Sequence, residues 1–307
     1  MRARQRTYIG PWPRIPLAMR CETRYLMAIM PGQVDRQTRK EALERELGEE
    51  VTCDGLTRDF VMFQRRRGHR HSTDDLLTAW YAVACFPAAS SEEPLRLLDL
   101  GSGIGSIGLA VLWAALQQAP DTRLTAIEAQ ELSARLLREN VDANDVSRET
   151  RVIHGDLRDA SLLADGTTFD LITGSPPYFD VKNGIVSADS QRAHARFELR
   201  GDVRDYARAA ARWLSPRGAF VLCFPTVQKQ RVLDAGTAAG LHLRSVRDVV
   251  PKEGTAALFS LFAYVHASAA NGTAPSLGPD FVVRDRSGAH TPALTTARAC
   301  FGLCEPP

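Results

Sequence analysis

The segment Ser175-Pro176-Pro177-Tyr178 carries the side chains best placed for chemistry, because it directly follows Phe169 to Thr173, an apolar run typical of a strand. Successive prolines fix the backbone, so the carbonyl groups around them are held in place as hydrogen-bond acceptors. The Ser175 oxygen and the Pro176 carbonyl suit the two N–H groups of an amine whose lone pair is delocalised into a ring. Tyr178 suits stacking on that ring. We expect these four residues to be catalytic, in a reaction that needs neither a metal nor a covalent intermediate.

A second candidate site is the glycine-rich segment from Asp99 to Gly105, which follows the apolar run Leu95 to Leu98. Glycines between a strand and a helix let a ligand approach the backbone where a side chain would collide. Ligands of open α/β sheets bind beyond the strand ends, so Glu128 and Asp156 should point into the same crevice. Carboxylates only accept hydrogen bonds, so Glu128 suits two ribose hydroxyls and Asp156 an adenine amine. The expected cofactor residues are Asp99, Gly101, Gly103, Gly105, Glu128, Asp156 and Leu157.

The spacing Gly103-x-Gly105-x-x-Gly108 also satisfies the dinucleotide-binding fingerprint. However, Asp99-x-Gly101 begins the turn earlier than a dinucleotide site requires, and Asp156 would have no role in binding NAD. The pattern therefore favours S-adenosyl-L-methionine as the cofactor.

Strand-like and helix-like segments alternate from Pro94 onward, which implies crossover connections and a mostly parallel sheet. We expect an α/β, Rossmann-like class I S-adenosylmethionine methyltransferase fold with helices on both faces of the central sheet. The strand-like segments are Leu95 to Leu100, Leu124 to Glu128, Arg151 to His154, Phe169 to Thr173, Gly218 to Phe224 and Ala257 to Tyr264. The helix-like segments are Ile104 to Gln117, Leu132 to Val141 and Asp202 to Leu214.

Four regions are expected along the chain. Residues 1–50 are predicted to be a poorly ordered leader that ends in a charged stretch, Arg36 to Glu50, compatible with a helix. The Arg- and Pro-rich start favours a disordered leader or an over-long gene start over a transit peptide. Residues 51–90 are predicted to cover the site with a hairpin that turns at Asp54-Gly55 and a helix capped at Thr73-Asp74. Residues 91–268 form the methyltransferase domain, and residues 269–307 a tail with an edge strand at Phe281 to Arg284.

The composition is that of an ordinary globular chain, with 307 residues, 44% of them hydrophobic and 24% charged. No apolar run approaches the roughly 20 residues that span a bilayer, and the six cysteines are scattered without a CxxC pair. We expect a cytoplasmic protein with reduced thiols, no membrane or metal partner, and a monomeric state. The net charge is only +2, so any nucleic-acid surface must come from local clusters.

Two segments of the chain contain local clusters of basic residues, and both adjoin predicted site elements. The first precedes the predicted helix at Thr73, and the second follows the Pro-Pro-Tyr loop and includes an aromatic residue, Phe197. Both are expected to contact the phosphates of RNA. The expected RNA-binding residues are Arg65, Arg66, Arg67, His69, Arg70, Arg192 and Arg196.

With these motifs assembled, the chain resembles the bacterial tRNA adenine-N6 methyltransferases that modify the adenosine beside the anticodon of a valine tRNA. The resemblance runs from about Leu56 to about Tyr264. It rests on the Gln64 to Arg70 segment leading into Thr73-Asp74-x-Leu-Leu, on the glycine turn, and on the Pro-Pro-Tyr loop. It implies methyl transfer from S-adenosylmethionine to the N6 amine of an adenine in tRNA, with Thr73 and Asp74 closing over the methionine part of the cofactor.

One position departs from that family, which normally has asparagine where this chain has Ser175. Serine at this place also occurs in DNA methyltransferases that act on adenine N6 or cytosine N4, so the target base stays open. A protein glutamine-N5 methyltransferase acting on release factors is a further alternative, although it would leave the arginine segment unexplained. The last alternative is a non-catalytic module that binds S-adenosylmethionine or RNA.

Overall fold

The computed structural model describes residues 33–86, 94–180, 189–270 and 274–303. Within those ranges one sheet has the strand order β10-β8-β9-β7-β6-β3-β4-β5, and β11 pairs with β8 outside this path. Strands β3 to β7 run parallel, whereas β9 is antiparallel to β7 and β8. The strands are β3 (Arg96–Leu100), β4 (Arg123–Glu128), β5 (Thr150–His154), β6 (Phe169–Gly174), β7 (Leu214–Pro225), β8 (Leu241–Lys252), β9 (Phe259–His266), β10 (Ser276–Leu277) and β11 (Phe281–Arg284). The expected, mostly parallel sheet is confirmed.

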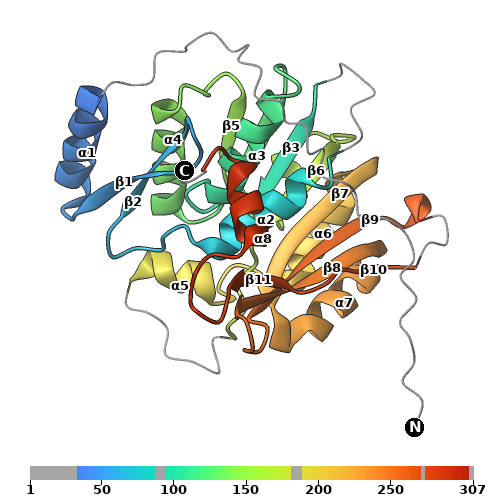
Figure 1. Ribbon diagram of the computed structural model, residues 1–307. Coiled ribbons are helices and arrows are strands. Elements are labelled where there is room, and N and C mark those ends of the chain that lie inside the picture. The colour runs from blue at the N-terminus through green and yellow to red at the C-terminus, as the bar shows by residue number, and fades with distance from the viewer. Residues whose placement is uncertain (1–32, 87–93, 181–188, 271–273, 304–307) are drawn as a thin grey trace.

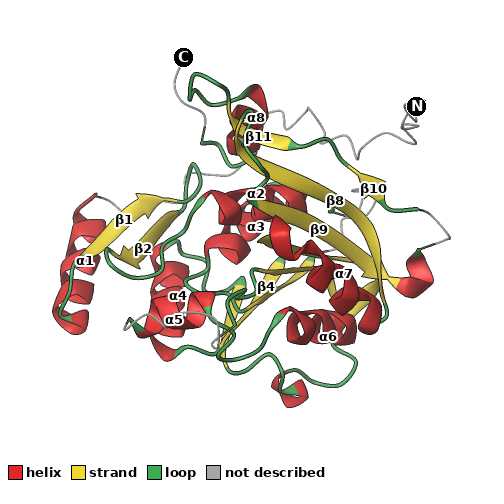
Figure 2. Ribbon diagram, turned by 90° about the horizontal axis from the view of Figure 1, so that it is seen from below, coloured by secondary structure: helices red, strands yellow, loops and turns green. Residues whose placement is uncertain are grey.

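Helices cover both faces of this sheet (Figures 1 and 2). Successive side chains of a strand point to opposite faces, so Leu97 joins the core beneath α2, α3, α4 and α8, whereas Leu98 joins the core beneath α6 and α7. The helices are α2 (Thr73–Val83), α3 (Ser106–Leu116), α4 (Glu131–Ala143), α5 (Ser190–Arg196), α6 (Val203–Trp213), α7 (Lys229–Ala238) and α8 (Pro292–Ala299). The parallel strands thereby end along one edge, where the predicted site residues follow them.

An antiparallel hairpin of β1 (Val51–Gly55) and β2 (Val61–Arg65) lies beside α4 (Figure 1). The hairpin is as predicted, but the turn is not at Asp54-Gly55: both residues lie in β1, and the chain reverses between residues 56 and 60. Asn144 Oδ1 accepts a hydrogen bond from the Val61 backbone N–H at 2.8 Å, and its amide nitrogen donates to the Val61 carbonyl at 2.8 Å. The side-chain amide acts as a partner strand would, so α4 fixes the position of the hairpin.

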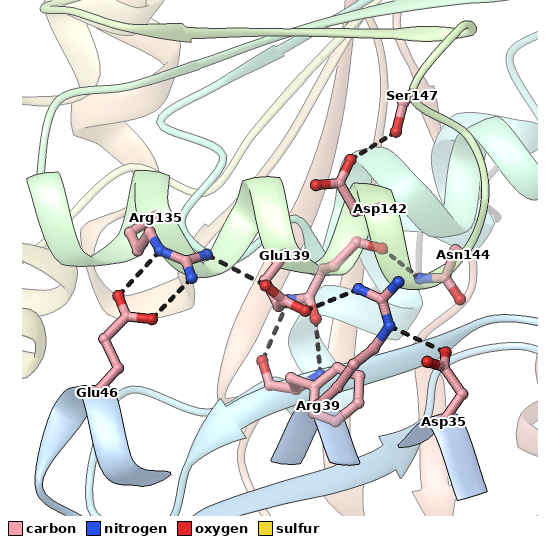
Figure 3. A network of polar contacts seen from close by, with 10 residues as sticks. Asp35, Arg39, Glu46, Arg135, Glu139, Asp142, Asn144 and Ser147 are labelled. Atoms are coloured by element: carbon pink, nitrogen blue, oxygen red, sulfur yellow. Dashed lines mark hydrogen bonds and ion pairs between the residues drawn. The ribbon is translucent and has the colours of Figure 1, made fainter. Parts of the chain in front are cut away.

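The region from Gln33 to Leu47 forms a helix, α1, which agrees with the helix expected over Arg36 to Glu50 and corrects the expectation that this part of the leader is poorly ordered. Figure 3 shows how ion pairs connect α1 to α4: Arg135 contacts Glu46 at 2.8 Å, and Arg39 contacts Glu139 at 3.0 Å. These ion pairs add to an apolar contact, because Leu43 of α1 is buried in the core and Leu47 packs against it. The rest of the predicted leader, residues 1–32, lies outside the described residues.

The C-terminal part contains more structure than the sequence predicted. The edge strand at Phe281 to Arg284 is confirmed as β11, but α7, β8 and α8 were not predicted. Leu294 and Ala297 of α8 are buried in the same core as α2 and α3, so this segment is part of the domain rather than a tail. Strand β7 also begins at Leu214, four residues before the predicted Gly218.

Two further findings concern the described residues only. No helix there has the length and apolar character that crossing a membrane requires. Four cysteines, Cys53, Cys85, Cys223 and Cys300, are described, and none forms a disulfide bond with another.

Candidate active site

The glycine turn joins β3 to α3 and has the backbone shape that the sequence predicts. Gly101, Gly103 and Gly105 all have left-handed φ angles, of 60°, 56° and 97°. A Cβ at Gly101 would lie 2.0 Å from the Tyr206 hydroxyl, whereas a Cβ at Gly103 would meet nothing within 4 Å. The Tyr206 side chain therefore fills the space next to Gly101, whereas the backbone at Gly103 faces open space that a ligand can occupy.

Asp99 supports this turn from the buried side. Its carboxylate accepts hydrogen bonds from the Thr173 hydroxyl at 2.7 Å and from the Gly108 N–H at 3.2 Å. The side chain is 2% exposed, and burial raises its pKa to about 6. Asp99 therefore connects α3 to β6 below the turn, and its carboxylate is engaged inside the protein.

Glu128, at the end of β4, lies next to the turn as predicted. Its carboxylate accepts a hydrogen bond from the Gly103 N–H at 2.8 Å and another from the Gln130 N–H at 2.6 Å. Burial raises the pKa of Glu128 to about 7. A carboxylate has about four acceptor positions, so two bonds to the backbone leave capacity for hydroxyl groups of a ligand.

Asp156 and Leu157 follow β5, the next strand along the edge. The Asp156 carboxylate forms an ion pair with Arg158 at 2.6 Å, and hydrogen bonding to Arg158 lowers its pKa. Leu157 is buried in the core beneath α6. Since β4 pairs with both β3 and β5 in parallel register, the glycine turn, Glu128 and Asp156 occupy one continuous edge of the sheet.

Tyr206 of α6 is a residue of this site that was not predicted from the sequence. Besides closing Gly101, its ring lies against Gly174, where a Cβ would be 2.9 Å from a ring carbon. Burial raises its pKa, and the charges of Glu128, Asp99 and Asp156 raise it further. In the sequence Tyr206 is one of several residues on the apolar face of a helix, so no pattern distinguishes it from an ordinary core tyrosine.

The Pro-Pro-Tyr loop begins where β6 ends and packs against β7. Ser175 Oγ lies 3.5 Å from Cys223 Sγ, and Pro176 and Pro177 are buried. The Tyr178 ring is half-buried, with its centroid 4.5 Å from that of Phe179 and 6.3 Å from that of Phe224.

Backbone contacts hold this loop from two sides. The Tyr178 N–H donates to the Arg196 carbonyl at 3.1 Å, and the Gln228 side chain donates to the Tyr178 carbonyl at 3.1 Å. Tyr178 is thereby fixed between the end of α5 and the segment after β7, with part of its ring accessible.

The first turn of α2 lies over the same edge. The predicted cap at Thr73-Asp74 is wrong by one residue, because Ser72 is the N-cap and its N–H donates to Asp75 at 3.2 Å. Asp74 lies within electrostatic reach of Tyr178 and Cys223, and Thr73 is exposed. Asp75, which sequence reasoning missed, accepts a hydrogen bond from Ser106 of α3 at 3.0 Å, and burial raises its pKa far above the usual range.

The first basic segment is largely engaged in internal ion pairs, which were not anticipated from the sequence. Arg65 is buried and contacts Asp189 at 2.7 Å, and it also pairs with Glu49. The more exposed Arg66 pairs with Glu50 at 2.5 Å, and Arg70 with Asp54 at 3.1 Å. These contacts correct the prediction for Arg65, whose guanidinium holds the start of α5 against the hairpin instead of facing solvent.

Of the remaining basic residues, Arg196 lies at the Pro-Pro-Tyr loop, because its carbonyl accepts from the Tyr178 N–H. His69 is within electrostatic reach of Asp74 and Arg196, and burial lowers its pKa. Arg196 and Arg67 are exposed and form no ion pair with any residue that the structure describes. Arg192 Nε is buried without a hydrogen-bond partner in the described part of the chain. The second basic segment thus presents charge beside Tyr178.

One cavity lies apart from this edge. It has a volume of about 650 Å³ and is enclosed by α1 and the hairpin, with Arg36, Lys40, Cys53 and Arg58 among its lining residues. Its walls carry both signs of charge and contain none of the predicted site residues.

Comparisons with known proteins agree with this geometry. The family model described as the methyltransferase small domain matches residues 83–201. A tRNA1(Val) (adenine(37)-N6)-methyltransferase of Aeromonas hydrophila is 33% identical over 179 residues, which cover 58% of this chain and 69% of the relative. A protein of the same name from Phocaeicola vulgatus is 29% identical over 199 residues, covering 64% of this chain and 77% of the relative.

Among solved structures, a predicted O-methyltransferase of Agrobacterium tumefaciens aligns with a TM-score of 0.53 at 18% identity. The alignment covers 76% of this chain and 98% of that one. At this level of identity the likeness concerns the fold. In eight relatives named tRNA1(Val) (adenine(37)-N6)-methyltransferase, the aligned part spans between 56% and 82% of their length.

Proposed function

Because the chain belongs to the family of tRNA1(Val) (adenine(37)-N6)-methyltransferases, we propose that it transfers a methyl group to the N6 amine of an adenine in tRNA. It is an S-adenosylmethionine-dependent methyltransferase with a class I fold. The observation that carries the proposal is the placement of the open glycine turn and the Pro-Pro-Tyr loop at the ends of neighbouring strands, β3 and β6. We further propose that it acts in the cytoplasm, where tRNA is modified.

The residues at the glycine turn fit S-adenosylmethionine. The space over Gly103 would admit the cofactor to the backbone, and the free acceptor capacity of Glu128 suits the two ribose hydroxyls. We assign Asp156 and Leu157 to the adenine of the cofactor, where the Asp156 carboxylate would accept from the amine. We assign Thr73 and Asp74 to the methionine end. Asp99 is reassigned: because its carboxylate bonds to Thr173 and Gly108, it would hold the turn in shape without contacting the cofactor.

When bound, S-adenosylmethionine supplies a methyl carbon on a positively charged sulfur, which departs as a neutral thioether with the electrons of the broken carbon–sulfur bond. The Ser175 oxygen and the Pro176 carbonyl would each accept one N–H of the adenine amine. These bonds draw the nitrogen lone pair out of conjugation and toward the methyl carbon. The nitrogen would form the new bond to the methyl carbon as the carbon–sulfur bond breaks, and its surplus proton would pass to solvent water, which the half-buried Ser175 leaves within reach. Rate would come mainly from holding amine and methyl group at near-attack distance.

Tyr178 would stack on the adenine after the base has left its loop. We assign Arg196, Arg192, Arg67 and His69 to the RNA backbone, and the exposed Arg66 and the half-exposed Arg70 would contribute less because carboxylates already partner them. Phe179, whose ring lies next to that of Tyr178, and Leu199 are exposed apolar side chains. A basic rim with apolar contacts suits single-stranded RNA of a tRNA loop.

The test is methyl transfer from labelled S-adenosylmethionine to tRNA, to DNA and to release-factor protein in separate reactions, followed by nucleoside analysis. We expect N6-methyladenosine in tRNA alone. A valine tRNA transcript with guanosine in place of adenosine 37 should lose the label, and a transcript altered at another adenosine should keep it. Label in DNA or protein, or N4-methylcytosine as the product, would overturn the proposal in favour of the corresponding alternative substrate.

A further inference from the structure

Ser175 presents a chemical problem that an asparagine at the same place would not. An asparagine amide has a carbonyl oxygen that only accepts hydrogen bonds, whereas a serine oxygen carries a hydrogen of its own. For Ser175 to accept from the adenine amine, its hydrogen must point elsewhere, toward another acceptor. If it pointed at the amine, it would oppose the N–H groups that the oxygen has to receive.

Cys223 lies where such an acceptor is needed. Gly174 of β6 pairs with Leu222 of β7, so the residues that follow, Ser175 and Cys223, are neighbours across the two strands. Their oxygen and sulfur atoms are 3.5 Å apart, within hydrogen-bonding range for sulfur. Cys223 is 6% exposed, whereas Ser175 is half-buried. The thiol therefore contacts the serine from the buried side.

The next group along this line is Thr78 of α2, which is fully buried and lies near enough to the Cys223 thiol to oppose the rise in its pKa. The Thr78 hydroxyl donates to the Asp74 carbonyl at 2.7 Å, so its oxygen is left to accept. Burial raises the pKa of Cys223 to about 12, so the thiol keeps its hydrogen and can donate it. Hydrogens can therefore be ordered in one direction, from Ser175 to Cys223, from Cys223 to Thr78, and from Thr78 to a backbone carbonyl.

We propose that Cys223 is a positioning residue for the methyl transfer: it accepts the Ser175 hydrogen, and so leaves the serine oxygen free to accept from the substrate amine. The proposal rests on the proposed function, since it assigns Ser175 the role of amine acceptor. It also accounts for the use of serine here, because the neighbouring thiol and threonine supply the direction that an amide carbonyl has intrinsically. Cys223 does not itself contact the substrate.

The chain offers a matched control in Cys85, which is also buried and has a raised pKa, about 11, but lies beyond the C-terminal end of α2. Cys223→Ala and Cys85→Ala remove the same atoms from equally buried sites. Cys223→Ser keeps a group that can both accept and donate. Ser175→Asn replaces the serine by an acceptor that needs no partner.

The experiment measures kcat and KM for tRNA, the dissociation constant of S-adenosylmethionine, and the Tm of each variant. We expect Cys223→Ala to lower kcat about five- to tenfold, the loss of one hydrogen bond, with KM and cofactor affinity within twofold of wild type. Cys223→Ser should recover at least half of the wild-type kcat. Adding Cys223→Ala to Ser175→Asn should lower kcat far less than it does beside Ser175.

The activity of the wild-type protein on tRNA is measured first, because a wild-type protein that methylates no tRNA would refute the proposed function itself. With active wild type, the positioning role is overturned if Cys223→Ala keeps full kcat, or if Cys223→Ser is as slow as Cys223→Ala. It is also overturned if Cys85→Ala slows the reaction equally, since both changes would then act through packing alone. The positioning role is likewise overturned if Cys223→Ala lowers kcat by the same factor in the wild-type chain and in the Ser175→Asn variant.

Discussion

The glycine turn and the first basic segment lie at the same edge of the molecule, yet the sequence describes them unequally well. At the turn, Gly101, Gly103 and Gly105 have the left-handed backbone that the motif predicts, and Glu128 bonds to the Gly103 N–H. In the basic segment, Arg65 is taken up by Glu49 and Asp189, which are 16 and 124 residues away. A site built from backbone shape is encoded locally, whereas the availability of a charge depends on partners that only the fold brings near.

The largest expected effect tests whether the cofactor pocket and the Pro-Pro-Tyr loop act independently. Replacing Tyr178 by alanine removes the ring proposed to stack on the target adenine, which is worth about 1 to 3 kcal/mol per base. We expect kcat/KM for tRNA to fall about 100-fold, while the dissociation constant of S-adenosylmethionine, measured by calorimetry, changes less than twofold. Tyr178→Phe keeps the ring and should retain most activity. A large loss of cofactor affinity in Tyr178→Ala would mean that the two halves of the site are not separate.

A second prediction concerns stability and tests the reassignment of Arg65. Arg65→Ala leaves Glu49 and Asp189 without their cation, and these carboxylates are partly exposed, with 28% and 17% of their side-chain surface accessible. The free energy of unfolding should fall by about 2 kcal/mol, less than for a fully buried pair because solvent screens the charges. Arg66→Ala, whose ion pair with Glu50 is exposed, should cost under about 0.5 kcal/mol.

Urea unfolding of the two variants under the same conditions gives both values. Equal stability of the two would show that Arg65 is as free as its neighbour, and would return it to the set of candidate phosphate ligands.

The fold shows the same division between local and distant information. Strands β3 to β6 and the helices between them were predictable because their apolar patterns are continuous. Strand β8 was not, because a register shift between Leu243 and Ser245 interrupts the alternation and the strand carries charges. Arg244 is exposed, and Asp248 is held by Lys229 of α7 and by Ser260 of β9. In the site, Tyr206 and Cys223 were missed for a related reason. Each has the sequence pattern of an ordinary core residue, and only the fold places it beside the motif.

The third prediction uses pH to test the cofactor pocket. Burial raises the pKa of Glu128 from 4.5 to about 7, so the carboxylate protonates as the pH falls through about 7. Ribose hydroxyls need the ionised form as an acceptor, so S-adenosylmethionine should bind about tenfold more weakly at pH 6 than at pH 8. Glu128→Gln should bind more weakly at pH 8 and lose most of this dependence. The raised pKa also means that the folded chain favours neutral Glu128 more than the unfolded chain does. The free energy of unfolding should therefore decrease as the pH rises from about 4.5 to about 7, and Glu128→Gln should remove this decrease.

Isothermal titration from about pH 5.5 to about pH 8.5, a range that brackets the raised pKa, provides the affinities. Asp99, whose pKa is raised to about 6, also titrates in this range, so the evidence is the difference between wild type and Glu128→Gln. The same slope in both proteins would remove Glu128 from the proposed cofactor contacts.

The smallest effect contrasts the two basic segments directly. Arg196 is exposed beside Tyr178 and forms no ion pair within the described residues, whereas Arg66 is held by Glu50. Each phosphate contact contributes about 0.7 to 0.9 to the slope of log K against log salt. Arg196→Ala should therefore weaken tRNA binding severalfold and reduce the slope by about one such contact, while Arg66→Ala should change the slope by less than half of that. Fluorescence titration with tRNA between low and moderate salt measures both slopes. An equal or larger change in Arg66→Ala would show that the Glu50 pair opens for RNA, and that internal ion pairs at this edge are exchanged for phosphates on binding.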